Sequence, residues 1–291
     1  MKGTTYIKGK QRMWARSRGM KLQGSQGNRG EKNYVMDLKE NFFEDPMDEH
    51  RKEIEAGDGG EFKDSGKQVA KAKALHSSSV LCINLFHYWS RKKELNKLCH
   101  ALGLCNKGSI SGRKLYFEKK LSILETKGNT PNLDVVIENT DKTQYKAYGI
   151  ESKFSEPFSK REDKKSHSES LSSYLQDTSI WKGLPHLKTL SESDLLDEEY
   201  QYLDLPQVVK HILGLKRKYG KRGFRLLYLW YDVPGVEGWQ HRREVEKFIK
   251  HAKEDQLKVT AITYQEVFTR LLEHYMERNE EYMKYLSDRY F

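Results

Sequence analysis

The sequence predicts an α/β fold in which helices flank a mixed central sheet. The first observation is the order of patterns after residue 75: a helix, three strands, a helix, a strand, a helix and a strand. The second is a pair of apolar, strand-like runs separated by a short polar segment, which indicates a hairpin. The third is the length of 291 residues, enough for one large domain or for a domain with extensions.

The first 30 residues are strongly basic, with eight lysines and arginines and no acid. Tyr6, Trp14 and several glycines are interleaved with these charges. Such a segment is typical of a flexible arm that lies along DNA phosphates or enters a minor groove. A disordered, solubilising tail is the alternative. The candidate phosphate contacts are Arg12, Arg16, Arg18 and Lys21.

Residues 31–74 form an acidic region between this arm and the core. Residues 37–64 hold eleven acids and four bases, so direct contact with DNA is disfavoured there. We expect a helix over residues 31–43, followed by a loop or linker. This region would pack on the core or on a second subunit.

The core is expected to begin with a helix over residues 79–98. Residues 76–79 supply polar side chains suited to an N-cap, and Leu81, Leu85 and Tyr88 recur at helical spacing. A strand-like segment follows at residues 115–118.

Two apolar runs, residues 131–137 and 147–153, contain the most informative residues of the chain. Asp134 lies among apolar neighbours, and burial of a carboxylate is costly unless something stabilises its charge. The segment between the runs predicts a hairpin, so the two strands would be antiparallel neighbours roughly 4.8 Å apart. Because side chains alternate faces along a strand, Glu151 and Lys153 share one face, and Asp134 can face Glu151.

Two carboxylates at that spacing repel each other unless a cation lies between them. Few hard oxygen ligands, with room for water, suit Mg²⁺, with Mn²⁺ as a possible substitute. A metal of this kind lowers the pKa of a bound water and balances charge on a phosphate, and Lys153 adds a cation for the attacking water or the transition state. These features predict a metal-dependent phosphodiesterase. The alternative is a surface ion pair between Asp134 and Lys153, which contributes little.

The motifs Asn132-Leu133-Asp134 and Glu151-Ser152-Lys153 resemble those of the PD-(D/E)xK nuclease superfamily, and more narrowly a family of bacterial restriction-endonuclease-like proteins. The resemblance covers about residues 75–265 and includes the segments His76-Ser77-Ser78-Ser79, Asn84-Leu85-Phe86 and Phe154-Ser155-Glu156-Pro157. It implies a restriction-endonuclease-like core, with Asp134 and Glu151 as metal ligands and Lys153 as the catalytic lysine. It also implies the carbonyl of Ser152 as a further ligand. Pro131 lies three residues before Asp134 rather than next to it, but it is not a ligand.

The superfamily often adds an acid from the first core helix, where this chain has Asn84. Asn84 serves either as a weaker polar contact of the site or as a buried amide that satisfies backbone groups. Glu118 is the other candidate, with a solvent-facing strand residue as its alternative, and Glu156 is a further auxiliary candidate. By the resemblance, Gln207 on a later helix touches the site, although an exposed helix start also explains it.

The last third of the chain predicts regular structure: a helix at 207–219, a strand at 224–231, a helix at 241–253, a strand at 258–264 and a helix at 266–291. A second basic cluster covers residues 216–225, from the end of the first of these helices into the segment after it. Its candidate DNA contacts are Lys216, Arg217, Lys221 and Arg222. The polar segment 154–173 is expected to be a DNA-contacting or lid loop, or a plain surface loop.

Composition excludes several other classes. Three cysteines form neither a paired framework nor a zinc pattern, which fits a reducing cytoplasm. There is no Walker A loop, no H-E-x-x-H and no G-x-S-x-G motif. No apolar run reaches the ~18 residues of a membrane span, and the N-terminus lacks a signal-peptide core. The formal net charge of +10 favours a polyanionic partner.

We therefore predict a cytoplasmic Mg²⁺-dependent endonuclease that cleaves double-stranded DNA with type II restriction-like sequence specificity and makes no membrane contact. It would consist of a basic arm (1–30), an acidic region (31–74), the nuclease core (75–265) and a C-terminal helix (266–291). A homodimer is expected, because two sites would address two strands. The alternatives are a structure-specific repair or recombination nuclease and a DNA-binding protein that keeps the fold without catalysis.

Overall fold

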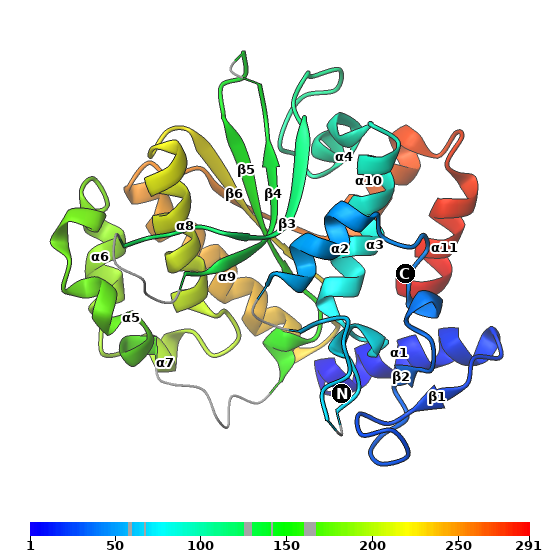
Figure 1. Cartoon of the computed structure of the whole chain (residues 1–291). Coiled ribbons are helices and arrows are strands. Elements are labelled where there is room, and N and C mark those ends of the chain that lie inside the picture. Colours follow the sequence, from blue (N-terminus) through cyan, green and yellow to red (C-terminus); the bar gives the residue numbers. More distant parts are fainter. Residues whose placement is uncertain (58–59, 67, 125–129, 141, 160–166) are drawn as a thin grey trace.

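The computed structural model describes residues 1–57, 60–66, 68–124, 130–140, 142–159 and 167–291. Its centre is a five-stranded sheet in the order β3-β4-β5-β6-β7 (Figure 1). β3, β4 and β5 are antiparallel neighbours, whereas β5, β6 and β7 run parallel, so the sheet is mixed, as predicted. The strands are β3 (Lys114–Lys120), β4 (Asn132–Glu138), β5 (Ala147–Lys153), β6 (Phe224–Trp230) and β7 (Val259–Thr263).

Helices cover both faces of the sheet, and each face has its own buried apolar cluster. The first cluster joins the sheet to α1 (Gly3–Ser17), α3 (Ser78–Arg91), α4 (Leu95–Ala101), α10 (Tyr264–Tyr275) and α11 (Glu280–Tyr290). The second joins it to α5 (His167–Leu175), α6 (Pro185–Ser191), α7 (Leu196–Glu199), α8 (Leu205–Tyr219) and α9 (Val236–Glu254). The alternation along β5 puts Ile150 in the first cluster and Ala147 in the second.

Gly149 lets α8 approach the sheet closely at the middle of β5. A Cβ at this position would lie 2.7 Å from side-chain atoms of both Leu133 and Leu215, so these two buried leucines would have to shift to accept any side chain. The approach brings the first two turns of α8 over the end of β5. Polar residues of α8 therefore contact the Glu151-Ser152-Lys153 segment of β5.

Two predicted helices are each divided in two. The helix expected over 79–98 breaks between α3 and α4, where Lys93 has φ +57°. The C-terminal helix breaks between α10 and α11, where Arg278 has φ +65°. After these breaks α4 packs against α3 and α10, and α11 packs against α1, which a helical repeat alone does not reveal. The helix predicted at 241–253 begins earlier, at Val236.

The expectation of a flexible N-terminal arm is wrong for most of that segment. Gly3–Ser17 form helix α1, which packs against α11 (Figure 1). Ile7, Trp14 and Ala15 are buried, and the Gln11 amide donates to the carbonyl of Arg289 at 2.9 Å. These buried residues lie at helical spacing between the basic ones, so the positive charges concealed an amphipathic pattern.

The helix predicted over 31–43 is also wrong. The chain there forms a two-stranded ribbon, β1 (Leu22–Gln23) with β2 (Tyr34–Val35), and a short 3-10 turn η1 (Leu38–Asn41). Asp37 caps this turn by accepting a hydrogen bond from the Lys39 amide. The remaining short elements of the first 75 residues are α2 (Asp48–Glu55) and η2 (Lys71–Lys73).

Helix α2 lies along the free edge of the sheet at β3. Glu53 accepts a hydrogen bond from the Phe117 amide at 2.9 Å, so it satisfies a backbone group that an edge strand leaves open. After β5 the chain forms η3 (Glu156–Phe158), and η4 (Thr178–Trp181) follows α5. Residues 160–166 of the predicted polar loop lie outside the described residues. None of the helices described is long and apolar enough to span a membrane.

Candidate active site

The ribbon of β4 and β5 brings Asp134 to the backbone amide of Ser152, the residue between Glu151 and Lys153. The ladder between β4 and β5 ends at the pair Val135 and Ile150, and one further step along both strands places Asp134 opposite Glu151. Asp134 Oδ2 accepts a hydrogen bond from the Ser152 amide at 2.6 Å. The acid of one strand thus contacts the backbone of the E-x-K motif directly.

Glu151 is fully buried, and each of its carboxylate oxygens faces a basic side chain. Lys153 Nζ lies 2.5 Å from Oε1, and His211 Nε2 lies 2.8 Å from Oε2. Lys153 also donates to Gln207 Oε1 at 2.9 Å. Gln207 and His211 are four residues apart on α8, so they project from the same helix face, one turn from each other.

Burial and mutual charge shift the pKa values of these groups strongly. Burial raises the pKa of Asp134 well above its usual range, and the charges of Glu151 and Glu118 raise it further. Burial opposes the charge of Lys153, but the charges of Glu151 and Asp134 prevail and hold the pKa of Lys153 well above its usual range. Burial also opposes ionisation of Glu151, yet Lys153 and His211 lower its pKa. Glu151 and Lys153 are therefore charged, and Asp134 adds a second acid that one lysine does not balance.

The donor set fits a small divalent cation. Among the described residues, neither Glu151 oxygen accepts a hydrogen bond of normal geometry, although both contact basic groups. The hydrogen bond from the Ser152 amide to the Asp134 carboxylate uses Oδ2. The residues described contain no group of three or more His, Cys, Asp or Glu side chains arranged around one metal position. Two carboxylates and water are the sparse oxygen set that Mg²⁺ accepts.

Glu118 lies beside Asp134, on the edge strand β3. It has a left-handed backbone conformation, with φ +48°, and its charge contributes to the raised pKa of Asp134. The two acids line a small internal cavity together with residues from the first turns of α3, namely Ser78, Ser79, Cys82 and Ile83. Glu118 and Asp134 thus line the same cavity from neighbouring strands.

Asn84 is held elsewhere, away from the acids. Its amide oxygen accepts from the Phe43 amide at 2.9 Å, and its nitrogen donates to the Asn41 carbonyl at 3.1 Å and to Tyr290 Oη at 2.9 Å. These bonds match the alternative of a buried amide that satisfies its neighbours. Asn84 does not line the cavity that holds Asp134 and Glu118, although Ser78, Ser79, Cys82 and Ile83 of the same helix do.

Glu156 and Ser152 support the turn that follows the E-x-K motif. Glu156 Oε2 accepts from the Phe154 amide at 2.9 Å, and its charge helps to raise the pKa of Lys153. The Ser152 side chain points to the opposite face, as predicted, where its hydroxyl lies 2.7 Å from Tyr264 Oη. Only the backbone of Ser152 faces Asp134.

The predicted DNA contacts differ in their partners and in their exposure. Arg12 pairs with Glu31, and Arg18 lies over the Trp14 ring and 3.8 Å from Asp288. Lys216 donates to the Ile180 carbonyl at 2.8 Å, and Lys221 to the Gly183 carbonyl at 2.7 Å. The exposed residues of the set are Arg16, Arg18, Lys21, Arg217 and Arg222.

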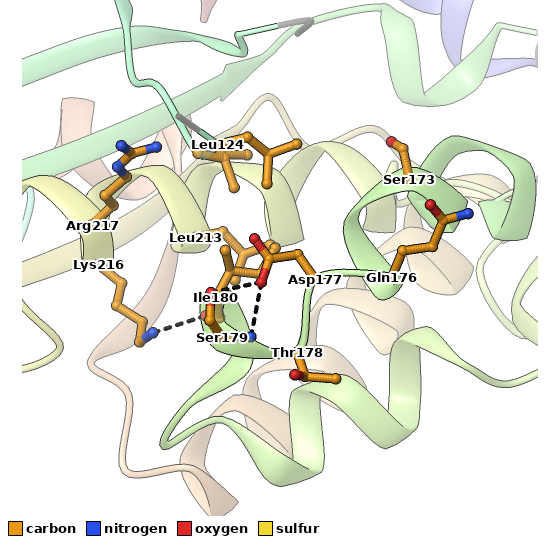
Figure 2. Close-up of a pocket in the computed structure, with 11 residues that line it drawn as sticks. Leu124, Ser173, Gln176, Asp177, Thr178, Ser179, Ile180, Leu213, Lys216 and Arg217 are labelled. Atoms are coloured by element: carbon orange, nitrogen blue, oxygen red, sulfur yellow. Dashed lines mark hydrogen bonds between the residues drawn. The ribbon is translucent and has the colours of Figure 1, made fainter. Parts of the chain in front are cut away.

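Asp134, Glu151, Lys153 and Glu118 are called the acid cluster below. A separate pocket of about 880 Å³ lies against the second half of α8 (Figure 2). Leu213, Lys216 and Arg217 line it from the helix, and Asp177 and Ile180 line it from η4 and its N-cap. Figure 2 shows Lys216 turned toward the η4 segment. None of Asp134, Glu151 and Lys153 lines this pocket.

His211 is the residue of the cluster that sequence reasoning overlooked. It is completely buried, and its Nδ1 has no hydrogen-bond partner within the described part of the chain. Its only sequence signal is its spacing: it follows Gln207 by four residues, on the buried face of an amphipathic helix. A histidine at such a position is most often a packed core residue, and only the contact with Glu151 distinguishes it.

Comparison with known proteins identifies a family for this chain. A family model described as "Restriction Endonuclease associating with ARP" matches residues 8–291. Searches of curated proteins and of solved structures find no match. The match spans nearly the whole chain and confirms the resemblance to restriction-endonuclease-like proteins. The chain therefore belongs to the restriction endonuclease family whose members are described as associating with ARP.

Proposed function

We propose that this protein is a divalent-metal-dependent endonuclease that hydrolyses phosphodiester bonds of double-stranded DNA. Membership of a restriction endonuclease family supports nuclease activity and a DNA substrate. The observation that supports the metal-dependent mechanism is the hydrogen bond to Asp134 from the Ser152 amide, between Glu151 and Lys153. It assembles two acids and a lysine at the end of two neighbouring strands.

Asp134 and Glu151 would hold Mg²⁺, or Mn²⁺ in its place, with the Ser152 carbonyl as a further oxygen ligand. The bound ion would supply a water of lowered pKa and a positive charge opposite the scissile phosphate. Glu118 would add its carboxylate from the other side of Asp134. His211 would keep Glu151 oriented through the contact with Oε2.

Lys153 would act as a cation rather than as a base. Its raised pKa keeps the ammonium group protonated at neutral pH. The Gln207 carbonyl oxygen and Glu151 hold that group in place, and its side chain is 12% exposed. A fixed positive charge at this position would orient the attacking water and stabilise charge that develops on the phosphate.

The same proposal includes DNA recognition, oligomeric state, a protein partner and localisation. We propose type II-like recognition of a DNA sequence by a homodimer, in which two active sites address two strands. The family description further supports association of this chain with ARP. We also propose that the enzyme acts in the cytoplasm, consistent with its free cysteines Cys82, Cys99 and Cys105.

The test is digestion of supercoiled plasmid and mapped linear DNA with Mg²⁺, and then with Mn²⁺. Wild type should cut both, and Lys153→Ala should lower the cleavage rate by about a thousandfold while duplex affinity stays within a few fold. Lys284→Ala, which removes a 74% exposed lysine on α11, is the matched control and should cut normally.

The fragments also decide the specificity. Discrete bands from linear DNA would support sequence recognition, and cutting confined to junctions or flaps would support a structure-specific nuclease instead. An unchanged rate in Lys153→Ala would refute the role of the lysine. Tight duplex binding without cleavage in either metal would favour the non-catalytic alternative.

A further inference from the structure

Trp239 is the exposed exception among the tryptophans. Four of the five are buried, with exposed fractions between 0% and 4%, whereas Trp239 is 56% exposed. Val236, three residues earlier on the same helix, is 69% exposed. Both belong to the first turns of α9, and an indole left in water at this position has no role in the core.

The exposed surface at Trp239 lies within reach of a DNA strand bound at the acid cluster. β6 ends at Trp230, the Cα partner of Lys153 across the parallel ladder, and α9 begins six residues later. At ~3.4 Å per extended residue and ~1.5 Å per helical residue, Trp239 lies within about 30 Å of Lys153. The Gly3 amide donates to Glu237 Oε2 at 2.6 Å, which anchors this turn of α9 to α1 (Figure 1). A DNA strand held at Lys153 would reach Trp239 within about one helical turn of ~34 Å.

An exposed cation lies beside the Trp239 ring. The guanidinium of Arg243, an exposed residue, lies 4.7 Å from the centre of the Trp239 ring. Four acids of the neighbouring elements have partners: Asp232 pairs with Arg242, Glu199 pairs with Lys247, Glu237 accepts from the Gly3 amide, and Glu244 accepts from the amides of residues 201–203. Glu198 and Glu246 are exposed and line a pocket together with Arg243. Arg243 is the cation that contacts the exposed ring.

We propose that Trp239 and Arg243 form a stacking platform for an unpaired base of a DNA strand that runs past the acid cluster. This inference rests on the proposed function and adds to it a contact outside the reacting atoms. The indole offers a face for stacking, and Arg243 offers a cation for the adjacent phosphate. Stacking on an aromatic side chain tolerates any base, because every base has a π face.

The surface suits a nucleic acid better than a protein partner. A stable protein interface buries roughly 800 Å² on each side, with an apolar centre. Here the exposed apolar side chains are Val236 and Trp239, and the same face continues with Gln240, Arg243, Glu246 and Lys250. A single aromatic ring beside a cation is the composition expected for one base and its phosphate.

Intrinsic fluorescence tests this directly, because Trp239 is the tryptophan accessible to solvent. Full-length protein is titrated in EDTA, which prevents cleavage, with a 20-nucleotide oligo(dT) and with a duplex that carries a 10-nucleotide dT overhang. Wild type should show quenching on binding, and Trp239→Phe should lose that signal while it keeps most of the affinity. Trp239→Ala should bind the overhang duplex about 5- to 150-fold more weakly and a blunt duplex nearly normally.

Leu272→Ala, at a 38% exposed apolar residue on α10, is the matched control and should change neither signal nor affinity. Wild-type affinity of Trp239→Ala for the overhang, or binding without any quenching, would overturn the platform. A change of oligomeric state in Trp239→Ala, seen by light scattering, would overturn it in favour of a protein contact. Lys153→Ala should still show full quenching. If wild type cleaves duplex DNA but shows no quenching, only this inference fails, and if it binds no DNA at all, the proposed function fails with it.

Discussion

Two buried cations, Lys153 and Arg289, are stabilised in opposite ways. Arg289 is 1% exposed and contacts neutral groups: it donates to the Asn41 carbonyl at 2.7 Å and to Tyr285 Oη at 2.6 Å, and it lies 4.2 Å from the centre of the Trp14 ring. No carboxylate pairs with it among the residues that the structure describes. Lys153 instead sits between acids, with Glu151 at 2.5 Å and Asp134 nearby.

The difference separates a structural site from a chemical one. The donors of Arg289 are used by fixed acceptors, and aromatic rings fill the space around it, so nothing is left for a ligand. In the acid cluster two carboxylates compete for one lysine, and the hydrogen-bonding capacity of Glu151 is not met by well-aligned donors. Buried charge that stays unbalanced is costly and is characteristic of functional sites. The imbalance is what a divalent cation would remove.

The largest effect on stability is expected at Arg289 and its neutral hydrogen-bond partners. Arg289→Ala removes a cation and leaves the side-chain oxygens of Asn41 and Gln11 buried without this donor, so we expect a loss of about 3–5 kcal/mol in the free energy of unfolding. Urea denaturation measures it. Arg278→Ala, at an 88% exposed arginine, should change stability by less than ~0.5 kcal/mol. Equal effects of the two variants would show that the Arg289 network contributes nothing.

The next largest effect is expected when the contact between His211 and Glu151 is removed. His211→Ala removes the contact with Oε2, so Glu151 would lose its orientation and Mg²⁺ affinity should fall by about 10- to 100-fold. Calorimetric titration of the DNA-free protein with Mg²⁺ measures this without any cleavage assay. His211→Gln keeps a side-chain donor and should recover part of the affinity. Wild-type affinity in His211→Ala would mean that the histidine only packs.

Removal of an acid should stabilise the metal-free protein. Asp134→Asn relieves the repulsion from Glu151 and Glu118 and keeps an acceptor for the Ser152 amide, so we expect a gain of about 1–2 kcal/mol in EDTA at pH 8. The pKa of Asp134 is raised in the folded state, so its cost is absent below the unfolded pKa of ~3.9. The cost grows as the pH rises toward the folded value.

Urea unfolding at pH 4 and pH 8 tests the sign of that effect. The stability gap between Asp134→Asn and wild type should be small at pH 4 and full at pH 8, and Mg²⁺ should narrow it by stabilising wild type. A gap that does not depend on pH would exclude ionisation of Asp134 as its cause.

The smallest effect concerns the exposed basic residues. Arg16 is exposed on α1, so Arg16→Ala should lower the slope of log affinity against log salt by about 1 if its charge meets a phosphate. Lys216→Ala is the matched comparison, because Lys216 already holds the Ile180 carbonyl and should alter the slope less. Fluorescence anisotropy of a labelled duplex at several salt concentrations measures both. Equal slopes for Arg16→Ala and wild type would remove α1 from the DNA interface.

Much of the fold was predictable because its signals are local. The apolar runs of β4 and β5, the polar segment between them and the period of two along each strand identify the hairpin and put Asp134 opposite Glu151. The helix breaks at Lys93 and Arg278 were not predictable, because the residues around them favour helix and the packing of the following segment imposes the turn. Helix α1 was concealed by basic residues on its exposed side.

The sequence by itself determined the sheet order of the hairpin and the acids and lysine that meet on it, since neighbouring strands and alternating faces depend only on short-range geometry. Tertiary structure alone decided that Asn84 packs among neutral partners, that His211 from a distant helix contacts Glu151, and that Arg289 is buried against the N-terminal helix. Those contacts join residues about 60 to 280 positions apart. Their partners are chosen by the packing of whole helices, which no local pattern encodes.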